Sequence, residues 1–165
     1  MLEVILDTET TGLSTLENHR IVEIGCVELN NQIPTDKIFH THINPQRSVS
    51  EEAYEIHGYS DEFLSNKKTF SEISEAFLNF IKDKKIVIHN ASFDLSFINY
   101  ELKLINQKPI DKKNVIDTLE MARSPRAGDS TAPTPVTAYM RAANGLGGYQ
   151  QVRGEALVSM IVNTE

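Results

Sequence analysis

Apolar and polar residues alternate in three segments near the start of the chain, at residues 3–7, 20–29 and 37–43. Alternation with a period of two, together with many β-branched residues, is typical of strands. Glycine, asparagine and proline residues separate the three segments and favour turns there. The pattern therefore predicts three strands, of which the second and third form a hairpin.

Apolar residues next recur at the three- and four-residue spacing of helices, over residues 50–57 and 69–83. We expect Thr69 or Ser71 to cap the second of these helices. The apolar stripe of that helix consists of Phe70, Ile73, Phe77, Phe80 and Ile81. A stripe of this width predicts that the helix packs on a core.

Two strand-and-helix units follow. A short apolar strand at residues 86–88 leads into an apolar-periodic helix, with Asp94 in its first turn. A last strand around residues 115–116 leads into a helix that begins within residues 117–123. Strands followed by strand–helix alternation predict an α/β fold, with a mixed β-sheet flanked by helices.

Residue usage changes abruptly after Arg123. Residues 124–165 contain no Lys, Phe or His, yet they hold five of the eight glycines and three of the six prolines. We therefore expect a core at residues 1–123 and a divergent, poorly ordered tail at 124–165. A shifted reading frame or a fusion of unrelated sequence would produce such a change.

The overall composition fits one globular domain, with 165 residues, 40% hydrophobic and 24% charged. No apolar run is long enough to span a bilayer and no charged leader precedes one, so we expect a cytoplasmic protein and no membrane partner. The single cysteine, Cys26, is expected to be a buried hydrophobe. The net charge of −7 argues against a surface that coats nucleic acid, but not against an enzyme acting on one strand end.

The candidate chemistry begins with two carboxylates, Asp7 and Glu9, which directly follow the first apolar run. Because side chains two residues apart leave the same face of a strand, these carboxylates lie about 7 Å apart along the chain. With Asp94 they make three oxygen ligands of the kind that Mg²⁺ or Mn²⁺ prefers, enough to hold a pair of ions. The competing interpretation is a solvated turn for the first pair and a first-turn residue favoured by the helix dipole for Asp94.

The chain resembles the epsilon-type proofreading subunits of bacterial DNA polymerase III, which are ribonuclease-H-like 3′-to-5′ exonucleases. Two motifs carry the resemblance: Asp-Thr-Glu-Thr-Thr-Gly at residues 7–12 and Ile-His-Asn-Ala-Ser-Phe-Asp at residues 88–94. The segments 21–25, 53–58 and 117–123 are similar too. The match runs in order over residues 2–123.

This resemblance implies a ribonuclease-H-like fold and a role for ten residues. Asp7, Glu9 and Asp94 would bind two divalent metal ions and carry catalysis. The substrate-contacting residues would be Thr10, Thr11, Leu13, Ile56, His57, Asn90 and Phe93. For His57 a surface imidazole at a helix end is the competing interpretation, and His89 is expected to be structural. The implied partners are the single-stranded 3′ end of DNA, the polymerase catalytic subunit and a small accessory subunit.

The family also needs a further downstream helix that carries a general-base histidine and, after four residues, a fourth metal-binding aspartate. No histidine follows His89 in this chain, so the element is absent and the family's C-terminal helices are missing or replaced. Losing a general base typically costs 10²–10⁴-fold in rate. We therefore expect an impaired nuclease; the alternatives are a degenerate nucleotide- or polymerase-binding module and an RNA-trimming exonuclease of the same fold. The missing helices would leave part of the sheet uncovered, which is expected to lower the stability of the fold.

Overall fold

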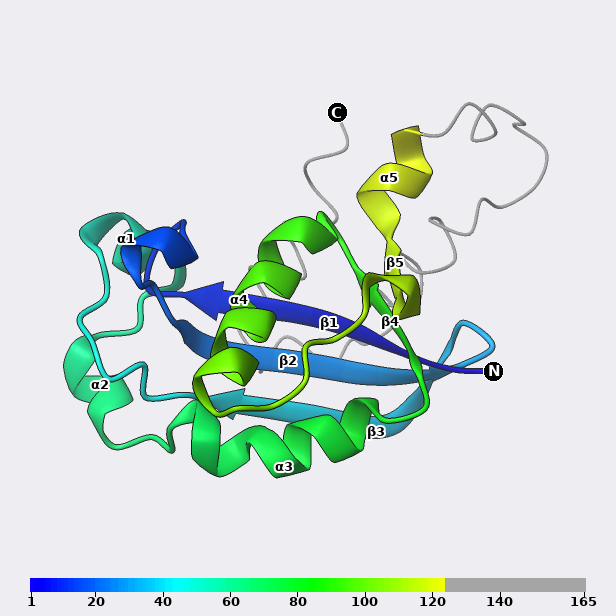
Figure 1. Ribbon diagram of the computed structural model, residues 1–165, viewed down its shortest axis with the longest axis horizontal. Coiled ribbons are helices and arrows are strands. Elements are labelled where there is room, and N and C mark those ends of the chain that lie inside the picture. The colour runs from blue at the N-terminus through cyan, green and yellow to red at the C-terminus, as the bar shows by residue number, and fades with distance from the viewer. Residues whose placement is uncertain (124–165) are drawn as a thin grey trace.

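The computed structural model describes residues 1–123, which form a five-stranded sheet in the order β3-β2-β1-β4-β5 (Figure 1). The strands are β1 (Leu2–Thr10), β2 (Ile21–Asn30), β3 (Ile33–His42), β4 (Lys85–Ile88) and β5 (Val115–Asp117). Strands β1, β2 and β3 are antiparallel neighbours, whereas β4 runs parallel to β1 and β5 parallel to β4. The expected mixed sheet and its hairpin are thus confirmed.

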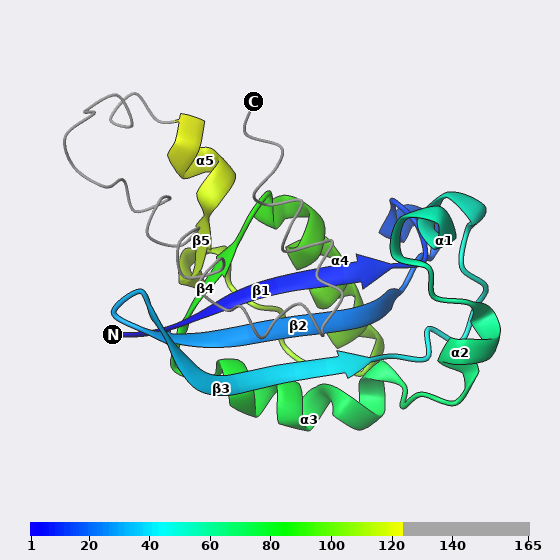
Figure 2. The ribbon, with the colours of Figure 1, turned by 180° about the vertical axis from the view of Figure 1, so that it is seen from behind.

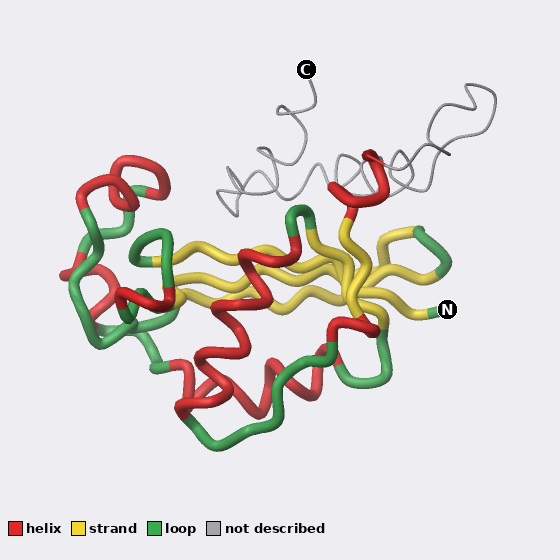
Figure 3. The backbone as a smooth tube through the Cα atoms, turned by 45° about the horizontal axis from the view of Figure 1, so that its top comes forward, coloured by secondary structure: helices red, strands yellow, loops and turns green. Residues whose placement is uncertain are grey.

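Helices cover one face of the sheet and the end of its three longest strands. The helices of residues 1–123 are η1 (Thr15–Glu17), α1 (Glu51–His57), α2 (Asp61–Ser65), α3 (Phe70–Ile81), α4 (Ala91–Leu104), η2 (Lys112–Asn114) and α5 (Thr118–Arg123). Helices α3 and α4 lie on the same face, and α1 and α2 lie beyond the strand ends (Figures 1 and 3). Among residues 1–123, no helix has the length and apolar character needed to cross a bilayer.

The main core lies between the sheet and helices α3 and α4. Even-numbered positions of β1, such as Val4 and Leu6, pack there with Phe77 of α3 and Phe97 of α4, and all four are fully buried. Each such side chain contributes about 1.5–3 kcal/mol through burial. Odd-numbered Ile5 belongs to a smaller cluster on the opposite face, which Figure 2 presents toward the viewer. The even-numbered and odd-numbered side chains of β1 thus pack in two separate hydrophobic clusters, on opposite faces of the sheet.

Several boundaries differ from the sequence-based expectations. Strand β1 continues to Thr10, so Asp7 and Glu9 lie within the strand rather than behind it. Helix α2 was not expected, because five residues are too few to show helical periodicity. Thr69, rather than Ser71, caps α3, in a capping box with Glu72. The predicted tail at 124–165 lies outside the described residues.

Candidate active site

Helix α4 brings the carboxylate of Asp94 to strand β1. Asp94 Oδ1 accepts hydrogen bonds from the backbone N–H of Thr8, at 3.0 Å, and from Thr8 Oγ1, at 2.7 Å. Thr8 is the residue between Asp7 and Glu9, and the charge of Asp94 is close enough to raise the pKa of Asp7, so two distant parts of the sequence bring acidic groups near one another. Asp94 lies in the first turn of α4, as expected, and its side chain is buried at 3% exposure.

The start of α4 is held in place by a residue to which we had assigned no role. The Asp117 carboxylate at the end of β5 accepts hydrogen bonds from the backbone N–H groups of Asn90, at 3.1 Å, and Ala91, at 2.9 Å. Asn90 precedes the helix with a left-handed φ of 57°, which asparagine tolerates better than most residues. Asp117 therefore fixes the first turn of α4, which contains Asp94.

Burial and neighbouring carboxylates raise the cost of ionising Asp7. Burial raises the pKa of Asp7 well above its ordinary value, and the nearby charges of Asp94 and Glu9 raise it further. Burial also raises the pKa of Asp94 to about 6, against the opposing effect of the Thr8 hydrogen bonds. Asp7 Oδ2 is buried and has no hydrogen-bond partner. Crowded acidic oxygens with an unsatisfied acceptor have the chemistry of a site for a hard divalent cation.

A pocket of about 380 Å³ lies beside these carboxylates. Its volume falls within the range of small-ligand pockets. Six predicted site residues line it: Glu9, Thr10, Leu13, Ile56, His57 and Phe93. Leu13 and Ile56 are 78% and 59% exposed, so they offer apolar surface at the mouth of the pocket. Asp7 and Asp94 do not line it, but Thr8 does.

His57 ends α1 next to Gly58, as expected, but it is not a surface imidazole. The backbone N–H of Tyr59 donates to His57 Nδ1 at 3.0 Å, so the proton lies on Nε2, which donates to the Thr10 carbonyl at 3.2 Å. Burial lowers the pKa of His57 and favours the neutral ring. Both ring nitrogens are therefore engaged, and what His57 presents to the pocket is its ring.

Two predicted substrate contacts do not reach the pocket. Thr11 is fully buried, and its hydroxyl lies 2.9 Å from His19 Nδ1 and accepts from the backbone N–H of Arg20 at 3.0 Å. Asn90 is exposed at the start of α4. His89 contacts the hydroxyl of Thr118 at 3.0 Å, consistent with the structural role expected of it.

Sequence reasoning missed two supporting features. His19 lines the pocket and packs over Gly12, where a Cβ atom would overlap its imidazole ring. Glu101 of α4 accepts two hydrogen bonds of 2.7 Å from the guanidinium of Arg20 and is itself buried. The spacing of Asp94 and Glu101, two helical turns apart, was the one signal that could have placed both on the inner side of α4.

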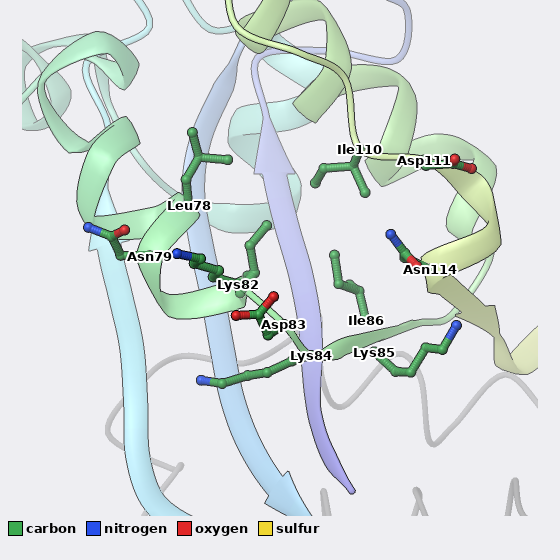
Figure 4. A pocket seen from close by; sticks show the side chains of 11 residues that line it. Leu78, Asn79, Lys82, Asp83, Lys84, Lys85, Ile86, Ile110, Asp111 and Asn114 are labelled. Carbon is green, nitrogen blue, oxygen red and sulfur yellow. The ribbon is translucent and has the colours of Figure 1, made fainter.

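A second pocket, of about 650 Å³, lies at the other end of β4 (Figure 4). It is lined by Leu78, Asn79, Ile81, Lys82, Asp83, Lys84, Lys85, Ile86, Ile110, Asp111 and Asn114. None of the predicted site residues lines it. Its Lys84 pairs with Glu28 at 2.7 Å, and Lys85 donates to the Lys113 carbonyl at 2.9 Å, so these ammonium groups already have partners.

Comparison with solved structures shows the same fold. The chain matches a structure of Exonuclease X in complex with 5′ overhanging duplex DNA, with a TM-score of 0.57 and 22% identity over 91% of this chain and 72% of that one. It also matches the metal-free form of an Escherichia coli ExoI–ssDNA complex, with a TM-score of 0.68 and 14% identity over 76% of this chain and 30% of that one. These neighbours confirm the ribonuclease-H-like architecture.

Curated relatives are more similar in sequence. DNA polymerase III subunit epsilon of Rickettsia conorii is 53% identical over 125 residues, covering 74% of this chain and 54% of the relative. The subunit of the same name from Escherichia coli strain K12 is 43% identical over 129 residues, covering 73% and 53%. The chain thus spans about half the length of the curated relatives it matches. The family model described as Exonuclease matches residues 4–147, and the chain therefore belongs to this exonuclease family.

Proposed function

We propose that this chain is the core of a metal-dependent 3′-to-5′ exonuclease of the epsilon proofreading type, which hydrolyses phosphodiester bonds at the 3′ end of DNA. The observation that carries the proposal is the contact of Asp94 with Thr8, the residue between Asp7 and Glu9. The relatives are named as subunits of DNA polymerase III, which supports a place beside a polymerase catalytic subunit. A small accessory subunit is a partner that only the family resemblance implies.

Asp7, Glu9 and Asp94 would hold two divalent ions, Mg²⁺ or Mn²⁺. The unsatisfied Asp7 Oδ2 supports this assignment, since a buried acceptor without a partner is costly. Carboxylate oxygens also match the preference of these hard cations. When bound, such ions supply a reactive hydroxide at neutral pH and stabilise charge on the attacking and leaving oxygens.

The chain's own residues would hold the end of a single strand against these carboxylates. Leu13 and Ile56, exposed at the pocket mouth, would pack on a terminal base, and the His57 ring would form the wall beside it. The hydroxyl of Thr10 donates to the Gly12 carbonyl at 2.7 Å, which fixes the turn that carries Leu13. Phe93 would line the same path.

Two further substrate assignments rest on the resemblance rather than on the pocket. Asn90 stands at the exposed start of α4 and would contact the strand outside the pocket. Thr11 would act through its backbone and through its hold on His19, since its own hydroxyl is buried.

We propose that activity is impaired, because the printed sequence has no histidine after His89 to act as general base. His57 cannot replace it while Nε2 donates to the Thr10 carbonyl and Nδ1 accepts from Tyr59. Water would then lose its proton to solvent, and the rate should fall by about 10²–10⁴-fold relative to an enzyme with a base.

Degradation of a 3′-labelled single-stranded DNA in Mn²⁺ tests the proposal. We expect slow release of mononucleotides, accelerated by free imidazole as a substitute base, and loss of this release in the Asp7→Asn variant. Equal rates for the two proteins would refute the nuclease assignment. A retained affinity for the DNA strand would then favour the binding-module alternative.

The same assay on an RNA strand of matched sequence tests the alternative of an RNA-trimming exonuclease, because RNA and DNA differ by the 2′-hydroxyl. A higher rate on RNA than on DNA would overturn the assigned substrate while leaving the reaction class in place.

A further inference from the structure

A second group of potential ligands lies on strands β2 and β3, outside the Asp7–Glu9–Asp94 group. It consists of Glu23, His40 and His42, whose ligand atoms all lie within 4.8 Å of one another. His40 Nε2 is 2.5 Å from Glu23 Oε1, and His42 Nε2 is 3.5 Å from the same oxygen. Both imidazoles therefore converge on one carboxylate oxygen, although the histidines belong to one strand and the glutamate to another.

Strand register explains why these side chains meet. Glu23 pairs directly with His42 in β3, and Gly25 pairs with His40. Side chains of directly paired residues lie on the same face of a sheet, and so do residues two apart in one strand. The register of β2 and β3 thus gathers all three side chains on a single face.

The surroundings hold Glu23 in position. The Tyr59 hydroxyl donates to Glu23 Oε2 at 2.8 Å, which leaves Oε1 directed at the two histidines. The His42 ring packs edge-on against Tyr59 and Phe63, with centroid separations of 4.8 and 5.1 Å. Glu23 is buried, while the side chains of His40 and His42 are 24% and 25% exposed. An ion could therefore enter from solvent into a pre-oriented ligand set.

A ligand set of two imidazoles and a carboxylate suits a different metal from the Mg²⁺ or Mn²⁺ that the Asp7–Glu9–Asp94 carboxylates favour. Imidazole is a ligand for zinc and other first-row transition metals, whereas Mg²⁺ prefers oxygen ligands. Zinc–nitrogen and zinc–oxygen bonds of about 2.0–2.2 Å require ligand atoms about 3.3 Å apart in a tetrahedron. The two histidine nitrogens lie 2.5 and 3.5 Å from Glu23 Oε1, on either side of this value, so small side-chain rotations would adjust the ligands to a bound ion.

We propose that Glu23, His40 and His42 form a transition-metal site of the Zn²⁺ class. Its ligands differ from the Asp7–Glu9–Asp94 carboxylates but adjoin them, because Glu23 pairs directly with Glu9 across β1 and β2. Tyr59 is its positioning residue. The site borders the 380 Å³ pocket that His57 lines, because Tyr59 stacks on His57 at a centroid distance of 4.9 Å and donates its backbone N–H to that ring. A bound ion would thus fix both edge strand β3 and the wall of the pocket.

Isothermal titration of Zn²⁺ into an Asp7→Asn/Glu9→Gln/Asp94→Asn variant tests the site apart from the Asp7–Glu9–Asp94 carboxylates. We expect one Zn²⁺ per chain, not displaced by millimolar Mg²⁺. Adding His40→Gln and His42→Gln should abolish this binding, while circular dichroism verifies that the variants remain folded. Tyr59→Phe should weaken it about 10–100-fold, the effect typical of losing a group that orients a ligand.

Imidazole NMR spectra of the unmutated chain provide a readout that does not depend on folding of variants. The resonances of His40 and His42 should shift on adding Zn²⁺ in excess Mg²⁺, whereas those of His89 should not. No zinc uptake by the Asp7→Asn/Glu9→Gln/Asp94→Asn variant, or the same uptake after both histidines are replaced, would overturn the proposal. In that case the three side chains form a hydrogen-bonded cluster only.

Discussion

Replacing Asp94 with asparagine should stabilise the metal-free protein at neutral pH. The Asp94 carboxyl has a pKa of about 6 in the folded chain, against 3.8 for an unperturbed aspartate. Ionisation therefore costs the folded state about 3 kcal/mol more than it costs the unfolded state. Asparagine avoids this cost and keeps an oxygen to accept the two Thr8 hydrogen bonds.

The effect has a defined pH window. Because its pKa is raised, Asp94 binds more protons in the folded state than in the unfolded state between about pH 4 and pH 6. The unmutated protein thus loses stability as the pH rises through this window, whereas the Asp94→Asn variant lacks this loss. The difference in unfolding free energy should grow by about 2.5 kcal/mol from pH 4 to pH 7.5.

Urea unfolding followed by circular dichroism, in a chelator at four pH values, measures this difference. The matched control is Asp36→Asn, at an exposed position on β3, which should show no such growth. Added Mn²⁺ should stabilise the unmutated protein at pH 7.5 far more than the Asp94→Asn variant. A stability difference between the two proteins that stays constant with pH would refute the electrostatic reasoning.

Three further substitutions test the supporting structure. Glu101→Ala should lower the unfolding free energy by about 3 kcal/mol, because it leaves the Arg20 guanidinium without its buried partner; an unchanged urea midpoint would contradict this. Gly12→Ala should weaken mononucleotide binding and cost about 1–3 kcal/mol of stability through overlap with His19, whereas Gly25→Ala, with open space around its Cβ, serves as the matched control. If both alanine variants behave alike in thermal melts and binding titrations, the close packing is not limiting. Phe77→Ala should cost about 3–5 kcal/mol, and a loss below 1 kcal/mol would contradict its place in the core.

Local patterns were sufficient for most of the fold. The stripe from Phe70 to Ile81 predicts α3, because helical spacing in a long segment leaves few alternatives. The end of β1 was placed too early, since the polar run from Thr8 to Thr10 hides its strand character. That stretch remains extended because it pairs with β2, a contact that no local pattern reveals.

Some residues of the site were likewise predictable from local sequence patterns, and others were not. The same-face placement of Asp7 and Glu9 follows from strand periodicity. Their grouping with Asp94 was a hypothesis from ligand chemistry, which the family resemblance then strengthened. Glu23 and the two histidines of β3 escaped notice because they meet only through the register of two strands. A hydrophobicity pattern reports which face is buried, and it does not report which residues lie opposite one another.

Helix α4 is attached to the sheet by acidic groups at two points, Asp94 on Thr8 of β1 and Glu101 on Ile21 at the start of β2. Seven residues of helix separate these points by about 10.5 Å. Two such attachments oppose both rotation of the helix about its axis and sliding of the helix along the strands. Any adjustment of Asp94 during ion capture must therefore come from torsion of its own side chain, and the backbone framework is already in place before a ligand arrives.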